Sequence, residues 1–132
     1  MLEQCVEYGM RHVLMVGHAG KLVKIAGGIF QTHNRVADAR MEIIAAYAAA
    51  LGADAAAVRD ILDAVTTEAA FSVIERAHID GVYDRLIQRI GYHCRRYMGS
   101  GVEFGCVMFS MDKGLLAMDE QAKHMVEGFK HV

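Results

Sequence analysis

Short apolar runs alternate with helical apolar spacings along this chain. Residues 13–16 form a continuous apolar run closed by Gly17, which predicts a strand buried on both faces of a parallel sheet. A second short apolar run covers residues 104–109, with a turn at 112–114 and a brief return through Leu115 and Leu116. The pattern therefore predicts two buried strands, the second with a short returning partner.

Most of the remaining sequence has the spacing of amphipathic helices. A helix is predicted over residues 2–10, and a short one follows the glycine turn that starts at Gly17 and is closed by Gly27 and Gly28. Further helices are predicted over 34–51, from 54, from 66 or 67, over 82–97 and over 119–128. The predicted capping residues are Asn34, Asp54, Thr66 or Thr67, and Asp119. The expected buried faces include Val36, Ile43, Ile44, Tyr47 and Leu51; Val58, Ile61, Leu62 and Val65; and Tyr83, Leu86, Ile87, Ile90, Cys94 and Tyr97.

This order of elements predicts the α/β class, as a helix-rich domain with a small, mostly parallel sheet. No repeat, low-complexity tract or linker divides residues 1–132, so we expect a single domain. Two buried strands are too few for a doubly wound sheet, and the chain starts almost inside a helix. We therefore expect further strands from a preceding part of a larger two-domain α/β enzyme, or from a partner.

Composition narrows the classes of function. The absence of proline favours long helices. The net charge is −2, so the chain has no general basic field and nucleic acid is not an expected partner. Cys5, Cys94 and Cys106 are odd in number and far apart, which favours a reducing, cytoplasmic location. The apolar runs are too short for a membrane span, and the cysteine and histidine spacing predicts no metal site.

The candidate chemistry lies in residues 17–40. A helix that begins at the carboxyl end of a strand offers unpaired N–H groups and a partial positive charge to a ligand. Gly17 and Gly20 allow close approach to the backbone, and Lys21 and Lys24 lie three residues apart on the predicted helix. These features predict an anion site. The spacing is neither that of a Walker loop nor of GxGxxG, and a tight turn with solvated lysines is the alternative.

A second polar cluster follows at residues 32–42. It holds Thr32, His33, Asn34, Arg35, Asp38, Arg40 and Glu42 at the predicted entry to a helix. Histidine side chains change protonation near neutral pH, so His33 is a candidate general acid or base, and a hydrogen-bonded structural histidine is the alternative. Helix capping and surface ion pairs would also explain these residue types one by one, so only their position beside the lysine loop favours a site.

The segment from Gly17 to Asp38 closely resembles the signature of the CbiD family, the cobalt-precorrin-5B C1-methyltransferases. The family pattern, roughly G-x-x-G-K-L-x-K-x-A-x-G-x-F-x-T-H-S-R-x-A-D, is met except that Asn34 stands at the serine. The resemblance is strongest over residues 2–42, and residues 104–128 also look like the C-terminus of the family. Because family members are considerably longer, the resemblance implies that this chain corresponds to their C-terminal portion.

What the resemblance implies is transfer of a methyl group from S-adenosylmethionine to C1 of a corrin precursor, with cobalt arriving as part of the substrate. Recognition of the ring's carboxylate side chains needs clustered cationic groups and backbone N–H groups. The expected substrate-binding residues are Gly17, His18, Gly20, Lys21, Lys24, Thr32, Arg35 and Arg40. His33 and Asp38 are the expected catalytic residues for any proton adjustment.

Two other functions stay open at this point. The chain could be a non-enzymatic module that binds an anionic small molecule, a tetrapyrrole or a nucleotide, at the same loop. A nucleotide-binding domain is disfavoured because Leu22 replaces the hydroxyl residue that follows a Walker lysine. The expected partner is a small-molecule corrin precursor, without nucleic acid or membrane, and a homo-oligomeric state is left open.

Overall fold

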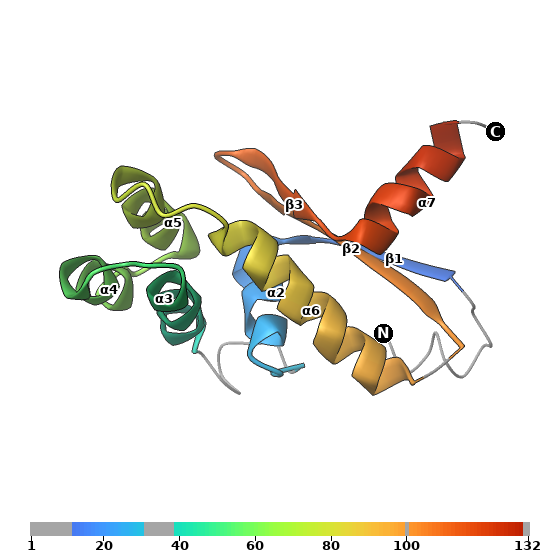
Figure 1. The fold of residues 1–132 in the computed structure, drawn as a ribbon, viewed down its shortest axis with the longest axis horizontal. Helices are drawn as coiled ribbons and strands as arrows, with labels where there is room; N and C mark the ends of the chain where they lie inside the picture. The colour runs from blue at the N-terminus through green and yellow to red at the C-terminus, as the bar shows by residue number, and fades with distance from the viewer. Residues whose placement is uncertain (1–11, 31–38, 100, 131–132) are drawn as a thin grey trace.

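A small mixed sheet organises the computed structural model, which describes residues 12–30, 39–99 and 101–130. Its strands are β1 (His12–His18), β2 (Glu103–Ser110) and β3 (Gly114–Met118), in the spatial order β1-β2-β3. β1 pairs with β2 in parallel, and β2 pairs with β3 in antiparallel (Figure 1). The two predicted strands and the short returning strand are confirmed, but β1 is not buried on both faces as predicted: Met15 is its one buried residue and Val16 is 58% exposed.

Helices make up most of the rest of the described chain. They are α2 (Ala19–Ala26), α3 (Arg40–Ala50), α4 (Ala55–Leu62), α5 (Thr67–Arg76), α6 (Val82–Met98) and α7 (Glu120–Lys130). Three predicted caps are confirmed by hydrogen bonds to the first turns of α4, α5 and α7. The acceptors are Asp54 Oδ1, Thr66 Oγ1 and Asp119 Oδ1, at 2.8, 3.1 and 2.8 Å from their amide donors. The fold is thus the helix-rich α/β domain that the sequence predicts.

The helices differ from the prediction at their ends and faces. The predicted helix over 2–10, the Asn34 cap and Val36 lie outside the described residues, and the described part of α3 begins at Arg40. Leu51, Leu62 and Val65 were expected in the core but are 40%, 43% and 85% exposed. α4 ends at Leu62, so the helical spacing no longer applies at Val65.

Small side chains take over part of the buried faces. α3 buries Ala45 and Ala48 together with Met41 and Ile44, because alanine allows a neighbouring helix to approach closely. In α6, the buried face of Leu86, Ile87, Ile90 and Cys94 is confirmed. Tyr97 is 43% exposed instead of buried, and its ring stacks on Phe30 with 4.6 Å between centroids.

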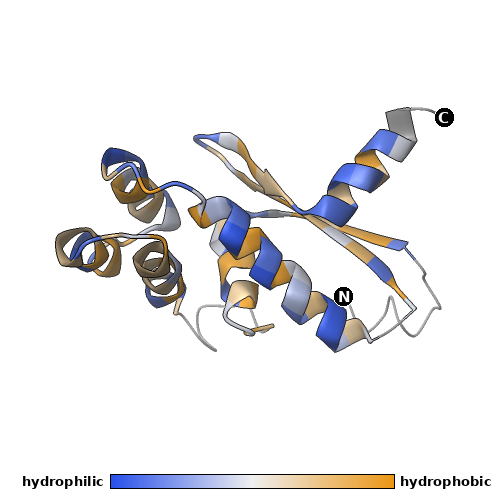
Figure 2. Cartoon of the chain, viewed as in Figure 1, coloured by the Kyte–Doolittle hydropathy of each residue, from blue (hydrophilic) through white to orange (hydrophobic). Residues whose placement is uncertain are grey.

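The two faces of the sheet are covered differently. Phe104, Cys106 and Met108 alternate along β2 and are buried on the face that α6 and α2 cover. Gly105 points the other way, towards α7, where an added Cβ would lie 2.6 Å from the Ala122 backbone nitrogen. Helices α3, α4 and α5 form a group at one end of the molecule (Figure 1). Figure 2 shows the hydrophilic positions along the outer side of α6.

Across the described part of the chain, no helix combines the length and the apolar character that crossing a membrane requires.

Candidate functional site

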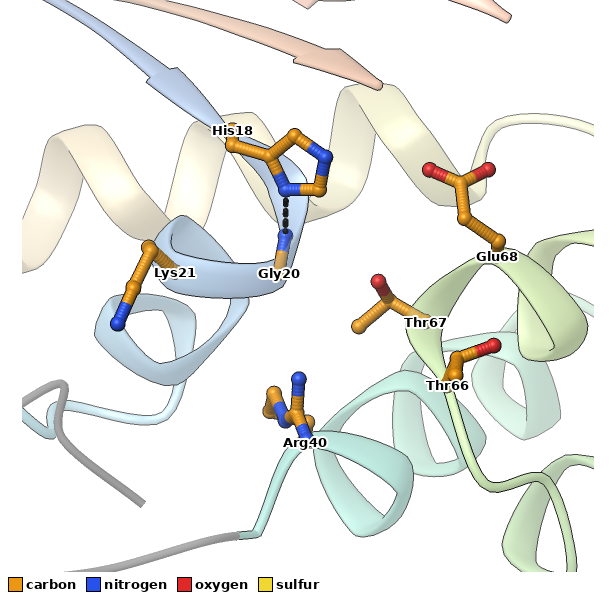
Figure 3. Close-up of a pocket in the computed structure, with 7 residues that line it drawn as sticks. All are labelled: His18, Gly20, Lys21, Arg40, Thr66, Thr67 and Glu68. Atoms are coloured by element: carbon orange, nitrogen blue, oxygen red, sulfur yellow. Dashed lines mark hydrogen bonds between the residues drawn. The ribbon is translucent and has the colours of Figure 1, made fainter. Parts of the chain in front are cut away.

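Three helices begin around one pocket at the carboxyl end of β1. α2 starts directly after the strand, and α3 and α5 point their first residues, Arg40 and Thr67, into the same space (Figure 3). The cavity has a volume of about 350 Å³ and is lined by His18, Gly20, Lys21, Arg40, Thr66, Thr67 and Glu68. Helix N-termini carry partial positive charge, so their convergence favours a negatively charged ligand group.

His18 forms one wall of this pocket and caps α2. Its Nδ1 accepts a hydrogen bond from the Gly20 amide at 3.0 Å. A neutral ring in this arrangement carries its proton on Nε2. The Gly20 amide is therefore already hydrogen-bonded and is not available to a bound anion. At this amide the imidazole of His18 takes the place that the sequence predicts for an anion.

The two glycines of the turn are explained by close packing. A Cβ on Gly17 would lie 2.9 Å from the Leu22 side chain. A Cβ on Gly20 would lie 3.1 Å from His18 Nδ1 and 3.6 Å from Thr67 Oγ1. Gly20 therefore leaves room for the capping His18 ring, whereas the distance to Thr67 is that of an ordinary contact between the starts of α2 and α5.

The two predicted lysines lie in different environments. Lys21 is exposed and lines the pocket, whereas Lys24 is fully buried and does not line it. Residues 22–26 of α2 are all buried, so the helix has no solvated face beyond its first turn. The structure brings Lys21 together with Arg40 instead, and Figure 3 shows the Arg40 side chain between α2 and the threonines.

Three lining residues were not predicted as site residues. Thr67 is 4% exposed, and Thr66 was recognised only as a helix cap. Both carboxylate oxygens of Glu68 are buried, and within the described chain neither has a hydrogen-bond partner. A buried carboxylate is stabilised by a donor or a positive charge, so Glu68 gives the pocket an acceptor opposite its cationic side.

Four of the predicted site residues, Thr32, His33, Arg35 and Asp38, lie outside the described residues. Their roles stay predictions. The other six are described, and five of them belong to the turn and pocket: Gly17, His18, Gly20, Lys21 and Arg40. In the portion of the chain with described coordinates, no three His, Cys, Asp or Glu residues group as metal ligands would.

Comparison with known proteins identifies relatives of this chain. The family described as CbiD, C-terminal domain, matches residues 31–120. A cobalt-precorrin-5B C(1)-methyltransferase of Alkaliphilus metalliredigens is 42% identical over 130 residues, which are 98% of this chain and 34% of the relative. The enzymes of the same name from a Thermoanaerobacter species and from Photorhabdus laumondii are 44% and 38% identical, covering 89% and 98% of this chain.

The chain spans about a third of the length of these relatives, 34%, 32% and 35% respectively. No solved structure gives a significant match. The family match covers more than half of the chain, from the predicted polar cluster to the start of α7. The chain therefore belongs to the CbiD family, over the C-terminal domain of that family.

Proposed function

We propose that this chain is the C-terminal portion of an S-adenosylmethionine-dependent methyltransferase that methylates C1 of cobalt-precorrin-5B in anaerobic cobalamin biosynthesis. The observation that carries the proposal is the pocket where the N-termini of α2, α3 and α5 meet beside Lys21 and Arg40. Its cationic side suits one of the carboxylate side chains of a corrin precursor. The family membership and the names of the relatives support the reaction.

In this proposal Lys21 and Arg40 hold a substrate carboxylate. Arg40 offers a planar pair of donors, and Lys21 adds a flexible charge at the rim. Thr67 supplies a neutral donor, and Glu68 repels a second carboxylate from the opposite side of the cavity. The pocket therefore accepts one carboxylate in one orientation, which fixes the ring relative to the protein.

Methyl transfer depends on the alignment of the donor methyl group with the nucleophilic ring carbon, so positioning supplies much of the rate. The residues that line the pocket are glycine or carry polar or charged groups, and none has a large aliphatic or aromatic side chain other than the His18 ring. The pocket suits a carboxylate better than an adenine ring. We therefore assign it to the corrin substrate rather than to the methyl donor. His33 and Asp38 stay the proposed residues for proton adjustment.

The test uses a fusion in which residues 1–132 replace the matched third of the Alkaliphilus metalliredigens enzyme. Methyl transfer to cobalt-precorrin-5B is measured at several substrate concentrations. Loss of one charge-assisted contact is worth about 1.4 kcal/mol, or about tenfold. Lys21→Gln and Arg40→Gln should therefore each raise KM for the corrin about tenfold, with a smaller effect on kcat.

Lys123→Gln is the matched control, because Lys123 is an exposed lysine on α7, outside the pocket, that pairs with Glu120 at 3.1 Å. It should leave KM unchanged. An active fusion in which Lys21→Gln and Arg40→Gln behave like Lys123→Gln would remove the pocket from substrate binding. His33→Ala and Asp38→Asn in the same fusion test the proposed catalytic residues, which should lower kcat.

The alternative is a binding module without catalysis. It predicts that the 132-residue chain binds a polycarboxylate tetrapyrrole in calorimetry, with loss of binding in Lys21→Gln, while the fusion transfers no methyl group. Calorimetry with ATP tests the nucleotide version of this alternative. The mixed charge of the lining, which includes Glu68 as well as Lys21 and Arg40, disfavours a triphosphate.

A further inference from the structure

Apolar side chains form two rows across the face of the sheet opposite α6. The strand register aligns Val16, Val107 and Met118 in one row, and His18, Phe109 and Leu115 in the next. Val16 is 58% exposed and Leu115 is 61% exposed. We call the five apolar residues of these rows, Val16, Val107, Phe109, Leu115 and Met118, the open sheet face.

α7 covers only the other end of this face. It packs at Gly105, which precedes the row of Val107 by two residues along β2. In Figure 1 the β2–β3 hairpin projects away from α7. The rows nearer the hairpin are thus left with exposed Val16 and Leu115 on the two outer strands, and half-buried Val107 and Phe109 of β2 lie between them. Contiguous exposed apolar residues of this kind mark an interaction surface, whereas single ones are ordinary.

The edge of the sheet beside this face is also unpaired. Within the described residues β1 pairs only with β2, so the other edge of β1 presents backbone groups without a neighbouring strand. Proteins protect such edges by pairing or covering them. An unpaired edge next to an apolar face favours a partner that brings both a strand and apolar side chains.

We propose that the open sheet face and the edge of β1 form the surface that binds the part of a CbiD-family enzyme preceding its C-terminal domain. The inference rests on the proposed function, because it requires the chain to work within an enzyme of the relatives' length. The matched relative has about two thirds of its length outside this chain, since the match covers 34% of it. Of the other large exposed apolar residues, Leu51, Leu62 and Val65 lie on or between helices away from the sheet, whereas Met111 lies in the β2–β3 turn beside the open sheet face.

This placement puts the preceding part next to the pocket. The His18 ring packs edge-on against Phe109 of the open sheet face, with 5.7 Å between ring centroids, and the same ring lines the pocket. A domain seated on Phe109 would therefore contact the wall of the carboxylate pocket. The ligand site would then be completed by residues from both parts of the enzyme.

Cysteine labelling tests the contact. Val16→Cys, Leu115→Cys and Val65→Cys are made separately in a Cys5→Ser background, in the 132-residue chain and in the fusion with the Alkaliphilus metalliredigens enzyme. The native Cys94 and Cys106 are buried and should not react while the protein is folded. Maleimide labelling rates are then compared between chain and fusion. Val65 is the control, because it is 85% exposed and far from the sheet in sequence.

The proposal expects labelling at Val16→Cys and Leu115→Cys in the chain, and loss of this labelling in the fusion, with Val65→Cys reactive in both. Equal labelling of all three in the fusion would overturn it. Slow labelling in the chain together with a dimeric mass would also overturn it, because a second copy would then cover the face. A protected but inactive fusion would contradict the proposed function alone, and an active but unprotected fusion would contradict this inference alone.

Discussion

The Arg95 guanidinium lies 2.7 Å from Oδ2 of Asp119, which is 6% exposed. The same guanidinium nitrogen donates to the Phe104 carbonyl at 3.0 Å, and Asp119 Oδ1 accepts from the Cys106 and Ala122 amides. One carboxylate thus joins α6, β2 and α7. This network lies at the opposite end of the parallel strands from the pocket, and it holds α7 on the sheet.

Asp119→Ala should lower the free energy of unfolding by about 3 kcal/mol, because it removes a helix cap and leaves buried donors without an acceptor. Urea unfolding measures the change. Glu120→Ala is the control on the next residue, which is exposed and pairs with Lys123, and it should change stability by less than about 0.5 kcal/mol. Equal effects of the two substitutions would contradict the structural role of Asp119.

His18→Ala should destabilise the protein by about 1 kcal/mol, because α2 loses the side chain that accepts from the Gly20 amide. His18→Asn keeps an acceptor at the cap and should recover most of that loss. Thermal unfolding of both variants measures the cap. If His18→Asn were as unstable as His18→Ala, the loss would come from the ring contact with Phe109 instead.

Tyr83→Phe should leave the free energy of unfolding unchanged at pH 7 or raise it by up to about 1 kcal/mol. The Tyr83 hydroxyl is buried and, although the Glu75 carboxylate lies near enough to help raise its pKa, it makes no hydrogen bond of good geometry with a described residue. Its removal therefore deletes a largely desolvated polar group. Phe71, whose ring packs edge-on against Tyr83 with 5.0 Å between centroids, would keep its contact. A loss of more than about 1 kcal/mol in urea unfolding would show that the hydroxyl is bonded.

Stability should fall as the pH rises from 9 towards 12. Burial raises the pKa of the Cys94 thiol from 9.0 to about 12. Burial and the carboxylates of Glu75 and Glu68 raise the pKa of Tyr83 from 10.0 to about 12. In this interval the unfolded chain has released protons that the folded chain retains, so the raised pKa values stabilise the fold fully below pH 9 and progressively less above it.

Cys94→Ala should reduce the loss of stability at alkaline pH, because it removes about one of the protons that the folded chain retains and the unfolded chain releases. Urea unfolding at intervals of pH from 8 to 11 measures the slope of stability against pH for the native chain and the variant. Identical slopes would contradict a raised pKa for this thiol in the folded protein. Tyr83→Phe provides a second comparison, with its effect confined to the range above pH 10.

Local chemistry made much of the fold predictable. Asp54, Thr66 and Asp119 were identified as caps because a short polar side chain before an apolar spacing satisfies amides only a few residues away. The apolar run of β1 was equally readable, since a strand buried between layers has no polar face. Val65 was misplaced because its spacing continues the pattern of α4 beyond the residue where the helix ends.

The candidate site was only half predictable for a different reason. Gly20 and Lys21 are near each other in sequence, whereas Thr67 and Glu68 reach the pocket through the packing of α5 against the start of α2. Nothing in the spacing of α5 indicates that contact. The burial of Lys24 was also unreadable, because a lysine within an apolar helix ordinarily indicates a solvated face.

Gly105→Ala should destabilise the protein by about 2 kcal/mol or more, because the new Cβ would lie 2.6 Å from the Ala122 nitrogen and 2.8 Å from its Cα. These are backbone atoms of α7, so the helix itself has to move. Gly128→Ala is the matched control: an added Cβ there meets nothing within 4 Å, and alanine favours a helix by up to about 1 kcal/mol. Thermal unfolding should therefore shift in opposite directions for the two variants. If Gly105→Ala were neutral, α7 would not rest on β2 at this position, and the boundary of the open sheet face would extend to the amino end of the strand.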